Sequence, residues 1–400
     1  MNLNHRIFRL KGVVQHYSWG GLNFIPRLLN IENKEQQPFA EYWMGAHPNH
    51  SSIIEGERSI SLNEFISKNT ETVLGKQVAK KFSSLPYLFK VLDVRQMLSI
   101  QVHPSKSAAA FAFEEEDKKG IAVTAANRNY KDRNHKPELM VALSDFWLLH
   151  GFKKEDELKK ILRSKKEFHL VSETFDSKSY RGLYEQVMLM DQQKVNEILH
   201  SLLQPVLALY ENNLLQRDSE DFWAARAAVN FSKDGNYDRG IFSIYFFNLV
   251  HLKKGEAIYQ PAGMPHAYLE GQNVEVMANS DNVLRAGLTD KHIDVDELMK
   301  HVRFESTIPN IINPSSNPKI FSSPAEEFEL QEYLLKENQQ EIMRTKTGEI
   351  FLVMNGAVEI QCNNEKINAY RGDSFFAIAE AEIELKALSD VDMFRVTVPA

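Results

Sequence analysis

The sequence predicts a mainly β chain that is interrupted by a helical segment and followed by a second, smaller β region. Short apolar runs separated by turn-forming residues occupy the chain up to about Phe152. From 153 to 240 the apolar residues follow a helical period instead, and strand-like runs return from Ile241 to about Arg285 and again after about 320. Short strands at such spacing are typical of barrels and sandwiches.

One short run in the first β region carries polar side chains on a single face. Side chains alternate between the two faces of a strand, so Ser99, Gln101 and His103 point one way while the apolar residues at 98, 100 and 102 point the other. The polar side fits either a solvated sheet face or a chelating pair. An amide oxygen and a neutral imidazole two residues apart can hold one metal ion.

The helical segment has recognisable start signals. Asp191 stands in an N-cap position before a stripe of apolar residues at i, i+3, i+4 and i+7. The stripe consists of Val195, Ile198, Leu199, Leu202, Leu203 and Val206. A further helix is expected to begin near Glu155, where acidic residues lead and basic residues follow, as the helix dipole favours.

The second β region follows an Asn-, Pro- and Ser-rich linker at 309–318. Residues 348–360 are predicted to form a β-hairpin with its turn at Asn355-Gly356, and a strand is expected within 372–378. We therefore predict a discontinuous β domain (1–152 and 241–310), a helical domain (153–240) and a C-terminal β domain (319–400).

Composition narrows the classes of partner. The 400 residues include 47 basic and 54 acidic ones, a net charge of −7, which argues against nucleic acid as the main partner. The single cysteine, Cys362, rules out a disulfide framework within the chain and fits a reducing compartment. The most apolar window is about half the ~20 residues that a membrane helix needs. We expect a cytoplasmic protein with no membrane partner.

The most specific motif is Gly255–His266, which fits the second motif of cupin barrels: a glycine, five residues, Pro-x-Gly, two residues and a histidine. The turn needs the conformational freedom of Gly263, and the returning strand directs His266 into the barrel. The motif ordinarily ends with asparagine four residues later, where this chain has Glu270. A lone histidine after a turn is usually structural, but the complete turn pattern favours a metal ligand.

Several charged residues stand in unusual surroundings. Pro137 favours extended backbone before it, so Lys136 and Glu138 should point the same way, as an exposed ion pair or as part of a site. Lys90, Glu275 and Arg285 lie within or beside apolar runs, where charges are rarely buried unless they are paired. They fit either structural ion pairs or an active-site cleft next to the motif histidine.

Taken together, these segments resemble the type I phosphomannose isomerases. The resemblance covers nearly the whole chain in order, at residues 17–20, 40–48, 88–92, 98–104, 134–138, 261–269 and 277–289. It implies a catalytic cupin (jelly-roll) barrel carrying a helical domain, followed by a second cupin barrel. The C-terminal stretch 372–380 lacks both Pro-x-Gly and the histidine, so we expect one Zn²⁺ per chain and no second metal.

The resemblance also implies roles for individual residues. The zinc ligands fall on Gln101, His103, Glu138 and His266. The expected catalytic residues are Arg285, Glu275, Lys136 and Tyr268, with Glu275 our choice for the base. The expected substrate and phosphate contacts are Ser99, Lys90, Trp19 and Asp281.

The implied activity is the interconversion of mannose 6-phosphate and fructose 6-phosphate by zinc-assisted proton transfer between C1 and C2, through a cis-enediol(ate). The partner is then a small sugar phosphate, and we expect a monomer. The principal alternative is a non-catalytic sugar-phosphate sensor that keeps the fold without the chemistry. An Fe(II) cupin dioxygenase fits poorly with Gln101 as a ligand, and a metal hydrolase would release free phosphate.

Overall fold

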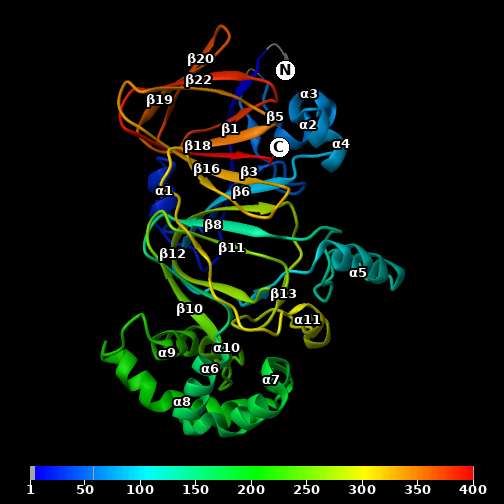
Figure 1. Ribbon diagram of the computed structural model, residues 1–400, viewed down its shortest axis with the longest axis vertical. Helices are drawn as coiled ribbons and strands as arrows, with labels where there is room; N and C mark the ends of the chain where they lie inside the picture. Colours follow the sequence, from blue (N-terminus) through cyan, green and yellow to red (C-terminus); the bar gives the residue numbers. More distant parts are fainter. Residues whose placement is uncertain (1–4, 57, 400) are drawn as a thin grey trace.

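Antiparallel sheets make up most of the molecule, and a group of helices lies at one end (Figure 1). The computed structural model describes residues 5–56 and 58–399. An eleven-stranded sheet lies in the middle, next to the helices, and an eight-stranded and a four-stranded sheet lie at the far end. The predicted β-rich fold with a helical insert is confirmed at this level.

The eleven-stranded sheet carries three predicted metal ligands, and the fourth, His103, directly follows its strand β7. Its strands are β2 (Val13–Gln15), β3 (Glu41–Gly45), β6 (Tyr87–Val94), β7 (Gln101–Val102), β8 (Glu138–Ala142), β9 (Phe146–Phe152), β10 (Phe247–Leu252), β11 (Ala257–Gln260), β12 (His266–Ala278), β13 (Leu284–Arg285) and β14 (Ile311–Ile312). The polar strand predicted over 98–103 is shorter than expected, since only Gln101 and Val102 pair as strand.

Strand β12 organises this sheet. It is 13 residues long and pairs with β6 and β8 along its second half, and with β7 and β9 at its start. Residues from four strands are thereby brought beside a single strand. The register shifts between Tyr268 and Glu270, where a β-bulge changes the face on which the following side chains lie.

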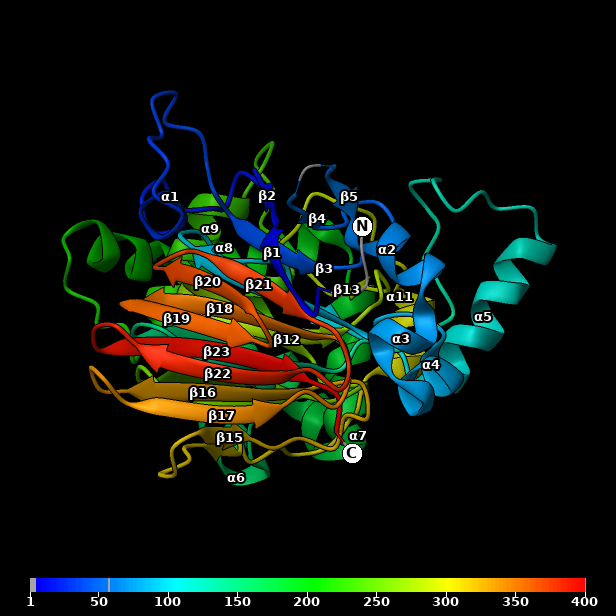
Figure 2. The same ribbon diagram turned by 90° about the horizontal axis from the view of Figure 1, so that it is seen from above.

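The other two sheets join the two ends of the chain. The eight-stranded sheet contains β1 (Ile7–Lys11), β4 (Ile53–Ile54), β5 (Ile60–Ser61), β15 (Lys319–Phe321), β16 (Glu329–Leu335), β18 (Glu349–Asn355), β21 (Ser374–Ala377) and β23 (Val391–Thr397). The four-stranded sheet contains β17 (Gln340–Arg344), β19 (Ala357–Cys362), β20 (Glu365–Tyr370) and β22 (Glu382–Ala387). Figure 2 shows these C-terminal strands side by side.

Two sequence predictions need correction here. Strand β1 pairs with β21, so an N-terminal segment assigned to the first domain belongs to the C-terminal sheet. The predicted hairpin is wrong as well: β18 pairs with β21 and β23, whereas β19 pairs with β20 and β22. Gly356 has the positive φ that a turn requires, but turn chemistry reverses the chain without choosing its partner.

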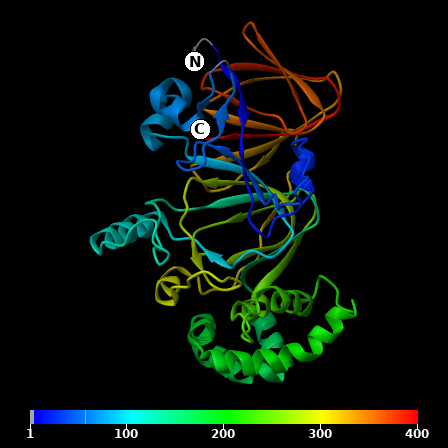
Figure 3. The ribbon, with the colours of Figure 1, turned by 180° about the vertical axis from the view of Figure 1, so that it is seen from behind.

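The helices gather mainly beyond β10, as the view from behind confirms (Figure 3). Those of this group are α6 (Glu155–Ser164), the 3₁₀ turn η1 (Lys166–Phe168), α7 (His169–Leu189), α8 (Gln192–Glu211), α9 (Glu220–Phe231) and α10 (Gly240–Phe246). The others are α1 (Phe24–Leu28), α2 (Leu62–Lys68), α3 (Thr70–Leu74), α4 (Lys76–Phe82), α5 (Lys106–Lys118) and α11 (Val295–His301). Helix α5 projects away from the sheets in Figures 1 and 2.

The predicted helix start at Asp191 is confirmed, but the predicted return to strand at Ile241 is wrong. The Asp191 carboxylate accepts a hydrogen bond from the Gln193 amide at 2.8 Å, and the whole predicted stripe of α8 is buried. Strand, however, begins at Phe247 rather than Ile241, because residues 240–246 form α10. All seven residues of α10 are buried, so no amphipathic period distinguishes this helix from a buried strand.

Two large apolar clusters fix these parts together. One packs the helices α6–α10 against β9 and β12 through fully buried residues such as Trp223, Phe168 and Phe246. The other fills the space between the central and eight-stranded sheets with Phe89, Val274 and neighbours. Fully burying such side chains contributes about 1.5–3 kcal/mol each. Over residues 5–56 and 58–399, no helix has both the length and the apolarity to cross a membrane.

Candidate active site

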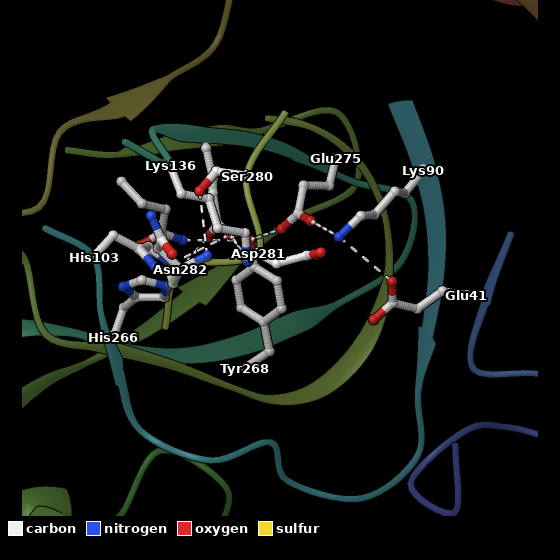
Figure 4. Close-up of polar contacts among 12 residues, drawn as sticks. Glu41, Lys90, His103, Lys136, His266, Tyr268, Glu275, Ser280, Asp281 and Asn282 are labelled. Carbon is white, nitrogen blue, oxygen red and sulfur yellow. Dashed lines mark hydrogen bonds and ion pairs between the residues drawn. The ribbon is translucent and has the colours of Figure 1, made fainter. Parts of the chain in front are cut away.

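Three predicted ligands converge at the ends of neighbouring strands. Glu138 opens β8, His266 opens β12, and His103 follows β7 directly. One ligand atom from each lies within 4.8 Å of the others, and all three residues are buried. Nε2 of His103 is 3.4 Å from one Glu138 carboxylate oxygen, and Nε2 of His266 is 3.2 Å from the other. The side chains of His103 and His266 lie side by side in Figure 4.

The hydrogen bonds of the two imidazoles set their tautomers. Nδ1 of His103 lies 2.8 Å from the Asn282 carbonyl oxygen, and Nδ1 of His266 lies 2.9 Å from that of Met264. A carbonyl only accepts, so each Nδ1 carries the proton and each Nε2 presents a lone pair to the cluster. Burial lowers the pKa of His103 to about 4, which keeps the ring neutral.

The donor set therefore fits a divalent metal ion. Nε2 of His103 is buried and has no hydrogen-bond partner among the described residues. Burial alone would raise the pKa of Glu138, but Lys136 and His103 outweigh it and hold the pKa well below its usual range. Two neutral imidazoles and one carboxylate are the ligands that zinc prefers in open, catalytic sites.

The Pro-x-Gly turn locks this arrangement, as the motif predicts. Gly263 has a φ of +80°, and a Cβ there would come within 2.8 Å of the His301 carbonyl oxygen. Its amide donates to the His103 carbonyl at 2.8 Å. The turn therefore fixes the backbone of one histidine while it delivers His266 to the strand that follows.

Gln101 and Arg285 lie beside the histidines in the sheet. Gln101 is directly opposite His266 across the β7–β12 pair and opposite Arg285 across the β7–β13 pair. Directly opposed residues of an antiparallel pair share a face. These three side chains are thus on one side of the sheet, and Ser99 and His103 lie two residues from Gln101 on either side.

A chain of buried charges lies deeper in the same sheet. Lys90 is directly opposite Glu275, and its ammonium is 3.2 Å from that carboxylate and 3.5 Å from Glu41. The Tyr268 hydroxyl donates to the other Glu275 oxygen at 2.7 Å, and the Trp43 indole donates to Glu41. Figure 4 shows Lys90 held between the two carboxylates.

This network shifts the pKa values of its members. Burial would lower the pKa of Lys90, but Glu41 and Glu275 reverse the effect and raise it. Burial, followed by the nearby charge of Glu138, raises the pKa of Glu275. Burial and Glu275 together raise the pKa of Tyr268, so the phenol stays protonated. Lys136 lies 2.9 Å from Glu138 and links this network to the metal ligands.

The predicted contacts Trp19 and Asp281 lie nearer the surface. Trp19 is half-buried and packs against the apolar cluster that includes Tyr268. Asp281 is 3.2 Å from Nε2 of His47, and that hydrogen bond lowers the pKa of Asp281. Nδ1 of His47 accepts a hydrogen bond from the Asn49 amide, so Nε2 carries the ring proton and donates a hydrogen bond to the Asp281 carboxylate. Sequence reasoning missed this buried histidine, although it lies within the segment 40–48.

Sequence reasoning also missed two lysines near Arg285. The pKa of Lys131 is lowered by burial, and Arg128 and Arg285 lower it further. The pKa of Lys291 is lowered by burial and then by Arg285. Burial lowers the pKa of Arg285 itself, which Asp290 partly opposes. Arg285 thus lowers the pKa of both lysines, which puts its positive charge close to each of them. The proximity of Lys291 to Arg285 in sequence is a signal that could have found it.

Asn282 was missed as well, and it supports His103. Its carbonyl accepts from His103, and its side-chain amide donates to the carbonyls of Asp132 and Asn134 at 2.8 Å each. Its side-chain oxygen accepts from the Lys131 amide at 2.7 Å. Asn282 is buried, so its hydrogen bonds hold His103 in place from behind.

Comparisons with known proteins agree with this geometry. Residues 7–155 match the model of the phosphomannose isomerase type I catalytic domain. The mannose-6-phosphate isomerase of Escherichia coli is 36% identical over 392 residues, covering 94% of this chain and 96% of that protein. The enzyme of Macaca fascicularis is 32% identical over 425 residues, covering 97% of each chain.

Two crystal structures of mannose 6-phosphate isomerases are also similar to this chain over nearly its whole length. The crystal structure of mannose 6-phosphate isomerase from Salmonella typhimurium, bound to its substrate fructose 6-phosphate and zinc, superposes with a TM-score of 0.89 at 33% identity. The alignment covers 99% of this chain and 100% of that one. A mannose 6-phosphate isomerase structure bound with zinc and yttrium gives the same TM-score, identity and coverage.

Proposed function

The chain belongs to the type I phosphomannose isomerase family, and from that premise we propose how its own residues interconvert mannose 6-phosphate and fructose 6-phosphate. The observation that carries the function is the convergence of His103, Glu138 and His266, in a chain similar over nearly its whole length to a zinc- and substrate-bound isomerase. The sensor alternative is not retained, because the ligand residues and Arg285 occur together in such a chain.

We propose that Gln101 completes the ligand set with His103, Glu138 and His266. Its position opposite His266 supports this assignment. When bound, zinc supplies one net positive charge (+2 from the ion and −1 from Glu138) that polarises the sugar oxygens. Asn282 and the Met264 carbonyl hold the two imidazoles in the tautomer that leaves Nε2 free.

Glu275 is the proposed base. Its raised pKa brings it toward the range in which a carboxylate can accept and return a proton. It takes the proton from C2 of open-chain mannose 6-phosphate and returns it to C1. A C2–H bond breaks and a C1–H bond forms through a cis-enediol, while O1 gains a proton and O2 loses one. Tyr268 and Lys136 are the proposed groups for those hydroxyl protons.

Arg285 is proposed to stabilise the negative charge of the enediolate and phosphate, together with Lys131 and Lys291. Arg285 lowers the pKa of both lysines, and a guanidinium presents a planar fork to oxygen anions. Lys90 is already shared by two carboxylates, so we propose that it sets the charge of Glu275. Phosphate contact by Lys90 and Ser99, and sugar contact by Trp19 and Asp281, stay predictions.

We propose that the catalytic cupin barrel comprises 1–152 and 241–310, the helical domain 153–240 and the C-terminal barrel 319–400. Strands β1, β4 and β5 are reassigned to the last of these, since they pair within its sheet. A monomer in the cytoplasm is also proposed. A site built from one chain and a single cysteine support this proposal.

An isomerase assay with chelator and zinc add-back tests the function. The full chain should convert mannose 6-phosphate to fructose 6-phosphate without releasing phosphate, lose activity with chelator and regain it with zinc. Release of inorganic phosphate instead would assign a hydrolase, and activity that resists removal of the metal would contradict the role of zinc.

A further inference from the structure

A second polar pocket lies on the outer face of the central sheet, where it meets the helices. Its volume is about 600 Å³, within the roughly 300–1,000 Å³ of small-molecule sites. Its walls come from α1, β6, α8, α9 and β12. No predicted ligand, catalytic residue or substrate contact lines it.

This pocket and the active site lie on opposite faces of the same two strands. Lys90 on β6 and Glu275 on β12 are directly opposed, and so are Asp93 and Gln272, three residues away on each strand. An odd spacing reverses the face of a strand. Gln272 donates to Asp93 at 2.7 Å, which fixes the floor of the pocket.

Glu270, which stands where the cupin motif ordinarily has asparagine, lines this pocket. The β-bulge after Tyr268 directs Glu270 to the pocket instead of the barrel interior. There the Glu270 carboxylate accepts hydrogen bonds from Arg217 and Arg226. The charge of Glu270 is thus neutralised by two arginines of the helical segment, of which Arg226 lines the pocket.

Two further arginines line the pocket, Arg27 from helix α1 and Arg95 from the end of β6. Arg27 and Arg95 are exposed, and within the described residues neither forms an ion pair with a carboxylate closer than 4 Å. Arg27, Arg95 and Arg226 line the pocket with the carboxylates of Asp93 and Glu270, which gives its lining a charge of +1 (+3 − 2) on a chain whose net charge is −7. Such a concentration of guanidinium groups is suited to phosphate oxygens.

We propose that this pocket binds a phosphate-bearing small molecule of the nucleoside phosphate class. Arg27, Arg95 and Arg226 contact the phosphate, and Phe24 and Tyr210, which also line the pocket, pack against a flat ring. Asp93 and Gln272 offer acceptor and donor groups for the remaining polar atoms. The site is separate from that of the sugar phosphate and does not depend on the proposed isomerase chemistry.

Calorimetric titration of the zinc-loaded full chain tests this proposal. Saturating mannose 6-phosphate and fructose 6-phosphate at equilibrium keep the catalytic site filled, and the probes are AMP and, separately, inorganic phosphate. AMP should bind saturably to one site. Arg95→Glu and Arg27→Glu should weaken binding at least about tenfold, because a repulsive carboxylate replaces a charge-assisted hydrogen bond. Both variants should keep isomerase activity.

Two control variants show whether AMP binds in this pocket or elsewhere on the chain. Arg58→Glu reverses a charge on an exposed arginine that does not line the pocket, and it should leave AMP binding unchanged. Arg285→Ala should lose isomerase activity and still bind AMP. Tighter binding of AMP than of phosphate supports the aromatic contact, and equal binding overturns it. No binding at millimolar AMP, loss in Arg285→Ala, or equal weakening in Arg58→Glu would overturn the pocket itself.

Discussion

Two groups of buried charged side chains differ in how their hydrogen bonds are supplied: the Arg395 network of the C-terminal sheet and the His103 cluster beside the central sheet. In the C-terminal region Arg395 donates to Glu349 at 2.6 Å and to the Tyr333 hydroxyl at 3.0 Å, and Thr397 completes the carboxylate at 2.9 Å. In the central sheet, Nε2 of His103 has no hydrogen-bond partner within the described part of the chain.

This difference distinguishes buried charges that stabilise the fold from buried groups that bind a ligand. A buried ion pair whose hydrogen bonds are all supplied by the protein holds strands together and has nothing left to offer a ligand. A buried nitrogen with a fixed tautomer and no partner is costly unless something binds it. The His103, Glu138 and His266 group is thus explained by a metal ion, whereas the Arg395 network is explained by folding.

The largest expected effect comes from removing a metal ligand. His266→Ala should abolish zinc binding and isomerase activity, since a divalent ion loses one of two imidazoles in a site with few ligands. Metal analysis of the purified variant checks this. His150 is a matched control, because it is a buried histidine directly opposite His266 in the sheet. His150→Gln should keep zinc, and a full complement of zinc in His266→Ala would contradict the assignment.

A substitution in the Arg395 network should lower the stability of the protein and leave its catalytic activity almost unchanged. Glu349→Gln leaves the buried Arg395 without its counter-charge, so the free energy of unfolding should fall by about 3–5 kcal/mol. Denaturant unfolding of the zinc-loaded protein measures this. Turnover of the folded fraction should stay close to that of the wild type. A large fall in turnover with unchanged stability would break the comparison.

Arg285 should affect turnover without affecting the metal. Arg285→Ala should lower kcat/KM by about 10²–10³-fold, the effect of removing one charge-stabilising donor, while zinc content stays full. Steady-state kinetics with metal analysis measures both. Lys291→Ala should cause a smaller loss that appears mainly in KM. Near-normal turnover of Arg285→Ala would remove Arg285 from the mechanism.

The smallest effect concerns pH. Burial and then Glu332 raise the pKa of Asp392 to about 6. The native state therefore binds the proton more tightly than the unfolded chain, so stability is lost as pH rises from about 4 to about 6. Asp392→Asn should flatten this dependence and raise stability at pH 7 by at most about 3 kcal/mol, since one pKa unit corresponds to about 1.4 kcal/mol. Thermal unfolding between pH 4 and pH 7 measures it, and an unchanged slope would exclude Asp392.

The residues with local signals were the ones that sequence could predict. The Pro-x-Gly turn identified His266, the extended backbone before Pro137 put Glu138 beside Lys136, and alternation paired Gln101 with His103. The stripe of α8 and its cap at Asp191 were equally local. Each depends on turn chemistry or periodicity within a few residues.

The features that the sequence did not predict depend on pairing between segments far apart in the chain. Strand β1 joins β21 from the other end of the chain, and β18 and β19 separate into different sheets, although Asn355-Gly356 suits a hairpin. Lys131, Asn282 and Lys291 reach the site on loops that only the folded sheet brings together. In the sequence, Glu270 is only a departure from the cupin motif. The structure explains it by the β-bulge after Tyr268 and by the hydrogen bonds that its carboxylate accepts from two arginines of the helical segment.

The most direct test of the metal centre is anomalous diffraction at the zinc edge from crystals of the full chain grown with zinc. We predict one ion with Nε2 of His103, Nε2 of His266 and a Glu138 oxygen at about 2.0–2.2 Å, and the Gln101 amide oxygen as the fourth protein ligand. A zinc peak that contacts none of these side chains would contradict the account.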